Sequence, residues 1–195
     1  LLILIVCLGT GVYEEALFRG LAIPCLMRAF EPVGDDSRTH GELPSRRTGT
    51  EHTAKTPPTR FTPLVKAAAV SAVLFSVLHL SGADAVAELT AAGSTYVAAV
   101  VALQLVLKQL EGLLFGICMA YLYVKSSSIW QPALVHGVFD LCVLGPQLFA
   151  TGSVPSTYLT GSWSDAFAVL AVVIVLIPAA AVSIKRLASV KERSL

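Results

Sequence analysis

The chain has 195 residues, a net charge of +1 and only 14% charged residues, whereas 55% of its residues are hydrophobic. Soluble domains carry about 25% charged residues, and disordered chains combine low hydrophobicity with high net charge, so both classes are excluded. The balanced charge also provides no basic field for binding nucleic acid. We therefore expect a single membrane-embedded domain over 1–195, in a chain that is N-terminally truncated or processed because it begins at Leu1.

Five apolar stretches are each long enough to cross a bilayer, which takes about 20 residues in a helix. Backbone groups in lipid must pair within the protein, and these stretches are too long and too continuously apolar for barrel strands. We therefore predict an all-α fold, a polytopic transmembrane helical bundle of about five spans. In chain order the predicted spans are 1–28, 63–81, about 97–124, 130–149 and 163–184.

The segments between these spans indicate an orientation. A polar loop insertion occupies 31–62, shorter connections cover 82–94, 125–128 and 150–162, and a basic tail forms 185–195. If the tail lies on the cytoplasmic (or stromal) side, alternation places 31–62 and 125–128 there too. Of the 14 Lys and Arg residues, 12 then lie in or beside these inner segments, as the positive-inside rule requires. The compartment itself stays open.

A few charged residues remain inside the predicted spans, where each costs about 2.5–3.5 kcal/mol on insertion scales and is a candidate for function. In the first span, Glu15 and Arg19 are spaced i,i+4, so they can pair on one helix face. Glu14 lies about 100° away around the helix and stays available for chemistry. In the third span, Lys108 and Glu111 are spaced i,i+3, and we interpret them as a structural pair.

Two other predicted spans carry titratable residues. The second span contains His79, and the fourth contains His136 and Asp140 at i,i+4 on one face. Three helices therefore each present a group that can transfer a proton or bind a metal ion. A single polar site to which all three helices contribute explains this pattern better than three unrelated buried residues.

Three short motifs carry these residues in a fixed order. They read EEALFRG at 14–20, FSVLH at 75–79 and HGVFD at 136–140. Together they resemble the EExxxR, FxxxH and HxxxN motifs of the CPBP family of intramembrane proteases. This family includes the type II CAAX prenyl endopeptidases and the bacteriocin-processing or immunity (Abi-like) proteins. The resemblance covers about 12–144, apart from 31–62 and part of 82–100.

The resemblance implies hydrolysis of a peptide bond within a membrane cavity. In the family the first Glu of EExxxR and the His of FxxxH activate a water, and here these are Glu14 and His79. The resemblance assigns Glu15 and Arg19 to holding the first helix in place. The chemistry is consistent with this, because a carboxylate in an apolar site can serve as a general base near neutral pH.

The last motif leaves two roles open for His136 and Asp140. In the family this His and the following Asn stabilise the oxyanion or, in an older view, bind a metal ion. An ionised Asp140 would repel an oxyanion, and it would instead orient His136 or bind a cation. No cofactor is certain, and a zinc ion is a possible one, with the candidate ligands Glu14, His79, His136 and Asp140.

The leading hypothesis is a membrane endopeptidase, glutamate- or metal-dependent, that acts on a lipidated or membrane-associated protein such as one with a prenylated CAAX tail. Its partners would be that substrate and the lipid bilayer, without nucleic acid. A second hypothesis is a non-proteolytic CPBP-like immunity or scaffold protein. A third is a proton-coupled transporter, although the sequence contains no inverted repeat of the kind that many transporters have.

One geometric condition applies to the shared site. On straight, upright helices Glu14 and His79 lie about 20 Å from the inner membrane face, whereas His136 lies only about 9 Å from it. Helix tilt, an early helix start or a bend at Pro24 could bring them to one depth. We expect Glu14 and His136 to lie within about 10 Å of each other, since one site cannot form otherwise.

Overall fold

The structure, a computed structural model, describes residues 1–30, 63–80, 83–151 and 159–189. The regular elements in these ranges are all helices, which confirms the all-α class. They are α1 (Leu2–Glu15), the π-helix η1 (Ala16–Ala22), α2 (Ile23–Phe30), α3 (Pro63–Leu78), α4 (Ala83–Ala91), α5 (Thr95–Ser126), α6 (Trp130–Thr151) and α7 (Trp163–Ser189). The polar insertion at 31–62, most of the 150–162 connection and the end of the basic tail at 190–195 lie outside the described residues.

Two of these helices are long and apolar enough to cross a membrane by themselves. They are α5, with a mean hydropathy of 1.7, and α7, with a mean hydropathy of 2.9. The other three predicted spans are also helical, but η1 divides the first one and α3 has only 16 residues. The described residues therefore support a helical membrane protein, while the number of five spans and their sidedness stay predictions.

The connection expected at 82–94 is mostly helical instead. Residues 83–91 form α4, which packs against the start of α5. The segment is rich in Ala, the best helix former, and Asp84 lies in its first turn, where a negative charge stabilises the positive helix N-terminus. Gly93 ends the turn after α4 with a φ of +75°, a conformation that suits glycine. The prediction of a loop at 82–94 was wrong, because the helix propensity of its Ala residues outweighs the presence of a few polar residues.

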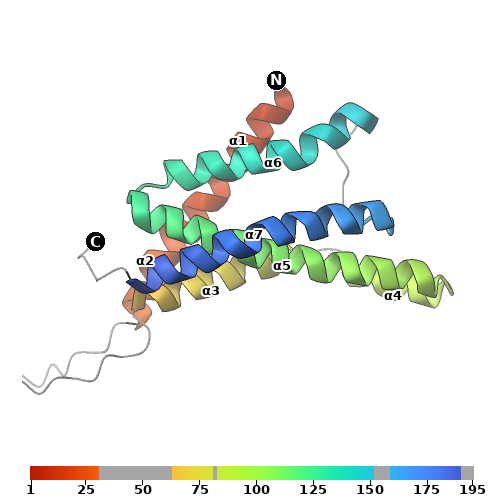
Figure 1. Cartoon of the computed structure of the whole chain (residues 1–195), viewed down its shortest axis with the longest axis horizontal. Helices are drawn as coiled ribbons and strands as arrows, with labels where there is room; N and C mark the ends of the chain where they lie inside the picture. Colours follow the sequence, from red (N-terminus) through yellow and green to blue (C-terminus); the bar gives the residue numbers. More distant parts are fainter. Residues whose placement is uncertain (31–62, 81–82, 152–158, 190–195) are drawn as a thin grey trace, which may run out of the picture.

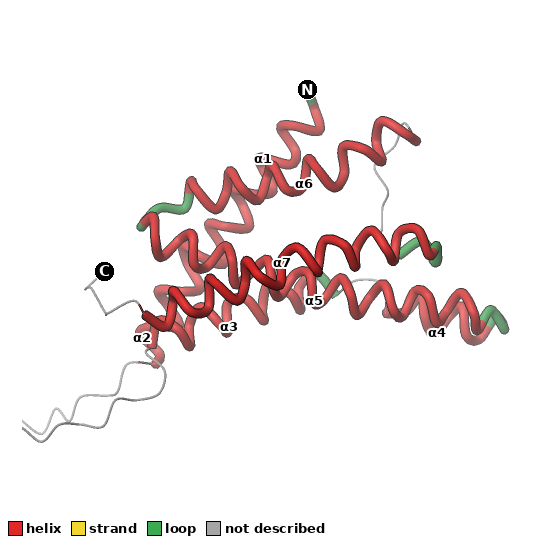
Figure 2. Tube along the Cα trace, in the orientation of Figure 1, coloured by secondary structure: helices red, strands yellow, loops and turns green. Residues whose placement is uncertain are grey.

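The helices form two groups (Figure 1). One group contains α2, α3, α4, α5 and α7, the other contains α1 and α6, and they meet along η1 and α5. Helix α5 packs lengthwise against α3 and α7, and α1 packs against α6. In Figure 1 α1 runs obliquely to α3, α5 and α7, and Figure 2 shows that helix continues with little interruption from α1 through η1 into α2. Helix α1 is thus strongly inclined to the group that contains α3, α5 and α7.

Glycines allow α1 and α6 to approach closely. A Cβ atom on Gly11 would lie 2.5 Å from the carbonyl oxygen of Ala133, and one on Gly137 would lie 2.8 Å from the Cα of Leu8. Small residues permit such backbone contact between membrane helices. Because His136 directly precedes Gly137, this crossing brings it to the end of α1.

A second close approach joins α3 to α5. A Cβ atom on Gly116 would lie 3.1 Å from the Cα of Ala72, and one on Gly112 would lie 3.4 Å from the Cα of Ser76. The two glycines have the GxxxG spacing that is common at membrane helix interfaces. This contact holds the C-terminal end of α3 beside the middle of α5.

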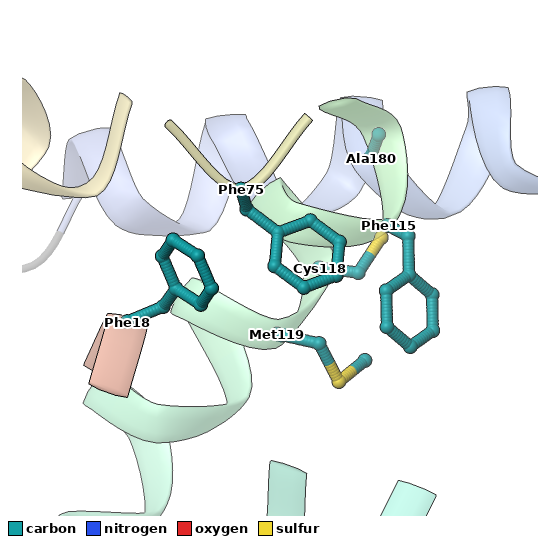
Figure 3. Close-up of a cluster of buried hydrophobic side chains, with 6 residues drawn as sticks. All are labelled: Phe18, Phe75, Phe115, Cys118, Met119 and Ala180. Carbon is teal, nitrogen blue, oxygen red and sulfur yellow. The ribbon is translucent and has the colours of Figure 1, made fainter. Parts of the chain in front are cut away.

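An apolar cluster lies where η1, α3, α5 and α7 meet (Figure 3). The rings of Phe18 and Phe75 pack edge to face, with centroids 5.2 Å apart. Phe115 lies 6.2 Å from Phe75 and fills the space toward α6. The buried members of this cluster are Phe18, Phe75, Phe115, Cys118, Met119 and Ala180.

The crossing of α1 and α6 predicts that Gly137→Ala destabilises the protein by about 1–3 kcal/mol, because the added methyl group would force two backbones apart. Gly145→Ala in the same helix is the matched control, since its Cβ would meet only the side chain of Leu141 at 4.0 Å. Denaturation in detergent micelles would measure both variants. Equal stability of the two would contradict the described crossing.

Candidate active site

Three helical segments bring the candidate residues together. The Oε2 atom of Glu14 lies 3.6 Å from Nε2 of His79 and 3.6 Å from Nε2 of His136. Asp140 Oδ2 lies 3.8 Å from the same nitrogen of His136. The 10 Å condition is therefore met, because α1, which runs obliquely to α3 (Figure 1), ends with Glu14 Oε2 only 3.6 Å from the imidazole of His136.

These side chains line a cavity of about 250 Å³ between α1, α3, α5 and α6. Glu14, His79 and Asp140 are partly exposed to it, with side-chain exposures of 19%, 34% and 20%, whereas His136 is almost fully buried. The cavity is large enough for several water molecules. A reacting group could therefore reach Glu14 and both imidazoles at once.

The π-helix begins directly after Glu15 and contains Arg19. Such wide turns are rare and frequently occur at functional sites. The predicted pair is confirmed, because Arg19 Nε lies 3.1 Å from Glu15 Oε2 and both side chains are fully buried. The Arg19 guanidinium also donates a hydrogen bond to the carbonyl of Gly116 and lies 4.8 Å from the Phe75 ring centroid. One cation thus links η1 to α3 and α5.

Glu15 orients His136. Its Oε1 atom lies 2.8 Å from His136 Nδ1. Because a carboxylate paired with Arg19 can only accept hydrogen bonds, we assign the proton to Nδ1, which then donates to Glu15. The Nε2 atom of His136 therefore faces Glu14 and the cavity.

His79, in the turn directly after α3, is oriented in the same sense by the end of that helix. Its Nδ1 lies 2.7 Å from the carbonyl oxygen of Phe75, so this nitrogen donates and Nε2 faces Glu14. Aromatic rings restrict both imidazoles, since Phe75 lies 4.4 Å from His79 and Phe115 lies 5.0 Å from His136 between centroids. Neither ring can turn freely.

The Oε2 atom of Glu14 is buried but accepts no hydrogen bond from any described residue. Distances of 3.6 Å to the two histidines are too long for direct hydrogen bonds. A buried carboxylate oxygen that faces two imidazole nitrogens across this gap can accept a proton from a small molecule held between them. This arrangement can carry out general acid–base chemistry.

Asp140 lies in the cavity without a direct hydrogen bond to His136, given the 3.8 Å separation. The sequence suggested that an ionised Asp140 would orient His136, whereas Glu15 performs that task through the other ring nitrogen. Within the described residues, no group of three or more His, Cys, Asp and Glu side chains has the arrangement of a metal site. The zinc ion stays a prediction, and we derive no step through it.

Sequence reasoning missed the position of Lys108 and Glu111. They do form the expected pair, with Lys108 Nζ 3.0 Å from Glu111 Oε1, but both also line the cavity that contains Glu14. Their location within an apolar span was the available signal. Helical spacing alone could not indicate which way they face.

Comparison with known proteins identifies the family of the chain. Residues 1–142 match the family described as Type II CAAX prenyl endopeptidase Rce1-like. No curated protein and no solved structure matches the chain. The matched range covers most of the chain and includes all three motifs, from Glu14 to Asp140. The chain therefore belongs to the Rce1-like family of type II CAAX prenyl endopeptidases, which are membrane-embedded proteases.

Proposed function

We propose that the protein hydrolyses a peptide bond in the CAAX tail of a prenylated, membrane-associated protein, using a water molecule activated by Glu14 and His79. The observation that carries this proposal is the approach of Glu14 Oε2 to within 3.6 Å of both histidine Nε2 atoms in one cavity. Membership of a protease family supports peptidase activity as the reaction class. The mechanism and the substrate are our inference.

The first chemical step is the attack of water. A water molecule between Glu14 and His79 transfers a proton to the carboxylate while its oxygen forms a bond to the carbonyl carbon of the peptide. The electron pair of the carbonyl double bond moves to the carbonyl oxygen. Because His79 Nδ1 is held by Phe75, its Nε2 can share the transferred proton with Glu14.

The second step requires stabilisation of the oxyanion and release of the amine. We propose that the reacting form of His136 carries a second proton, on Nε2, which it donates to the oxyanion while the Glu15 carboxylate accepts from Nδ1. A donor of this kind contributes about 10²–10³ in rate. When the carbon–nitrogen bond breaks, the proton held by Glu14 and His79 passes to the leaving amine. The products are a free amine and a carboxylic acid, which keeps the second proton of the water.

An apolar groove supports a substrate with a lipid anchor. It has a volume of about 630 Å³, lies between α5, α6 and α7, and shares Phe115 and Phe139 with the lining of the catalytic cavity. An isoprenoid chain in this groove would keep its attached cysteine near the cavity. Such a substrate would approach from the lipid side, because its anchor already resides in the bilayer.

We expect Glu14→Gln to lower kcat by about 10²–10⁴, since the amide cannot accept the proton from water. The assay is cleavage of a prenylated fluorogenic CAAX peptide by purified protein in lipid nanodiscs. Glu88→Gln, on the exposed surface of α4, is the matched control and should leave cleavage unchanged. Retained cleavage by folded Glu14→Gln would rule out the proposed base.

Removal of the buried cation should damage both stability and activity. Arg19→Met removes the cation from the buried carboxylate of Glu15 and leaves it only its contact with His136, so we expect a loss of about 3–5 kcal/mol in unfolding free energy. The exposed Arg28 in α2 provides the control variant Arg28→Met. The double variant Glu15→Gln/Arg19→Met should recover part of the stability but not the activity, because His136 loses its anionic partner. Full activity of the double variant would contradict this role of Glu15.

The open question of zinc can be tested at Asp140. Asp140→Asn should retain cleavage, because the amide can donate a hydrogen bond to the oxyanion, and should resist a strong zinc chelator. Peptide cleavage by wild type and variant would be measured before and after chelation. Loss of activity that added Zn²⁺ restores would instead support a metal site.

A further inference from the structure

The proposed reaction does not use the ion pair of Lys108 and Glu111 in α5. Its atoms are 3.0 Å apart, and the two side chains are only 17% and 4% exposed. Buried charges in membrane segments are costly and mark functional positions. The pair lines the catalytic cavity and also a second cavity of about 230 Å³ between α5, α6 and α7. The pair therefore borders both cavities.

The charges around the cavity point to an anionic ligand for Lys108. Its described lining contains three carboxylates, Glu14, Glu111 and Asp140, and Lys108 is its sole Lys or Arg side chain. Arg19 is fully buried and already engaged with Glu15. A negatively charged end of a peptide would be repelled over most of this surface and attracted only near Lys108.

The spacing along α5 fits the length of a CAAX tail. Phe115 packs against His136, with ring centroids 5.0 Å apart, and Lys108 lies two helical turns earlier, or about 10 Å along the axis. Three residues follow the modified cysteine of a CAAX motif before the chain ends. In extended form three residues also span about 10 Å. A tail whose scissile bond follows that cysteine would place its terminal carboxylate near Lys108.

We propose that Lys108 binds the free C-terminal carboxylate of the substrate and that Glu111 holds its ammonium group in place. An ammonium group has three donors, so Lys108 can keep its bond to Glu111 while it binds a carboxylate. This inference rests on the proposed function. Lys108 would then be a specificity residue, because it favours substrates whose C-terminal carboxylate lies three residues beyond the cleaved bond.

The test compares two prenylated peptides of identical sequence, one ending in a free carboxylate and one in a carboxamide. We expect the wild-type protein to cleave the free acid with a kcat/KM about 10–100 times that of the amide, as loss of a charged hydrogen-bond partner predicts. In Lys108→Met this ratio should fall toward one, mainly through a higher KM for the acid. Lys108→Arg should retain most of the preference.

Because Lys108→Met leaves Glu111 buried and unpaired, the variant Lys108→Met/Glu111→Gln removes both charges and protects the test against misfolding. Lys125→Met, at the exposed end of the same helix, is the matched control and should keep the wild-type ratio. Equal cleavage of acid and amide by the wild type, or an unchanged preference in the double variant, would overturn the role of Lys108. Neither result would contradict the proposed function. Failure of the wild type to cleave either peptide would overturn the proposed function and this inference with it.

Discussion

The buried carboxylate of Glu15 is the contact on which the site depends. It binds the guanidinium of Arg19 and the Nδ1 atom of His136, and Arg19 extends the network to the backbone of Gly116 in α5. In an apolar interior each of these charges is tolerable only while its partners are present. The network therefore links η1, α5 and α6 in one arrangement. Loss of any member would leave another polar group buried without its partner and would destabilise the fold.

Two adjacent glutamates thus perform different tasks. Glu15 faces the protein interior, where its carboxylate contacts Arg19 and His136. Glu14 lies about 100° away around the helix and faces the cavity. The close crossing of Gly11 and Gly137 allows this division, because it brings the end of α1 directly against His136. Phe75 and Phe115 restrict the imidazole rings from the opposite side. The result is a polar site that lies beside the apolar cluster of Phe18, Phe75 and Phe115.

Much of this could be predicted from the sequence. Long apolar stretches predict helices because the backbone must satisfy its own hydrogen bonds in lipid, and charged residues inside them predict a polar site. The i,i+4 spacing of Glu15 and Arg19 predicted their pair because both lie on one helical segment. The helix α4, the π-helix η1 and the exposure of Lys108 to the cavity were not predicted. The polar residues of 82–94 suggested a loop despite its Ala-rich helix propensity, and the other two features depend on packing.

The sequence by itself determined the helical class, the membrane character and the chemical groups of the candidate site, because composition, periodicity and short-range spacing are local properties. Only the tertiary structure decided that Glu14, His79 and His136 meet in one cavity. On straight helices they would lie at different depths, and an oblique helix crossing at glycines brings them together. The hydrogen bond from His136 to Glu15 likewise joins residues 121 positions apart in the chain, a distance over which no local pattern operates.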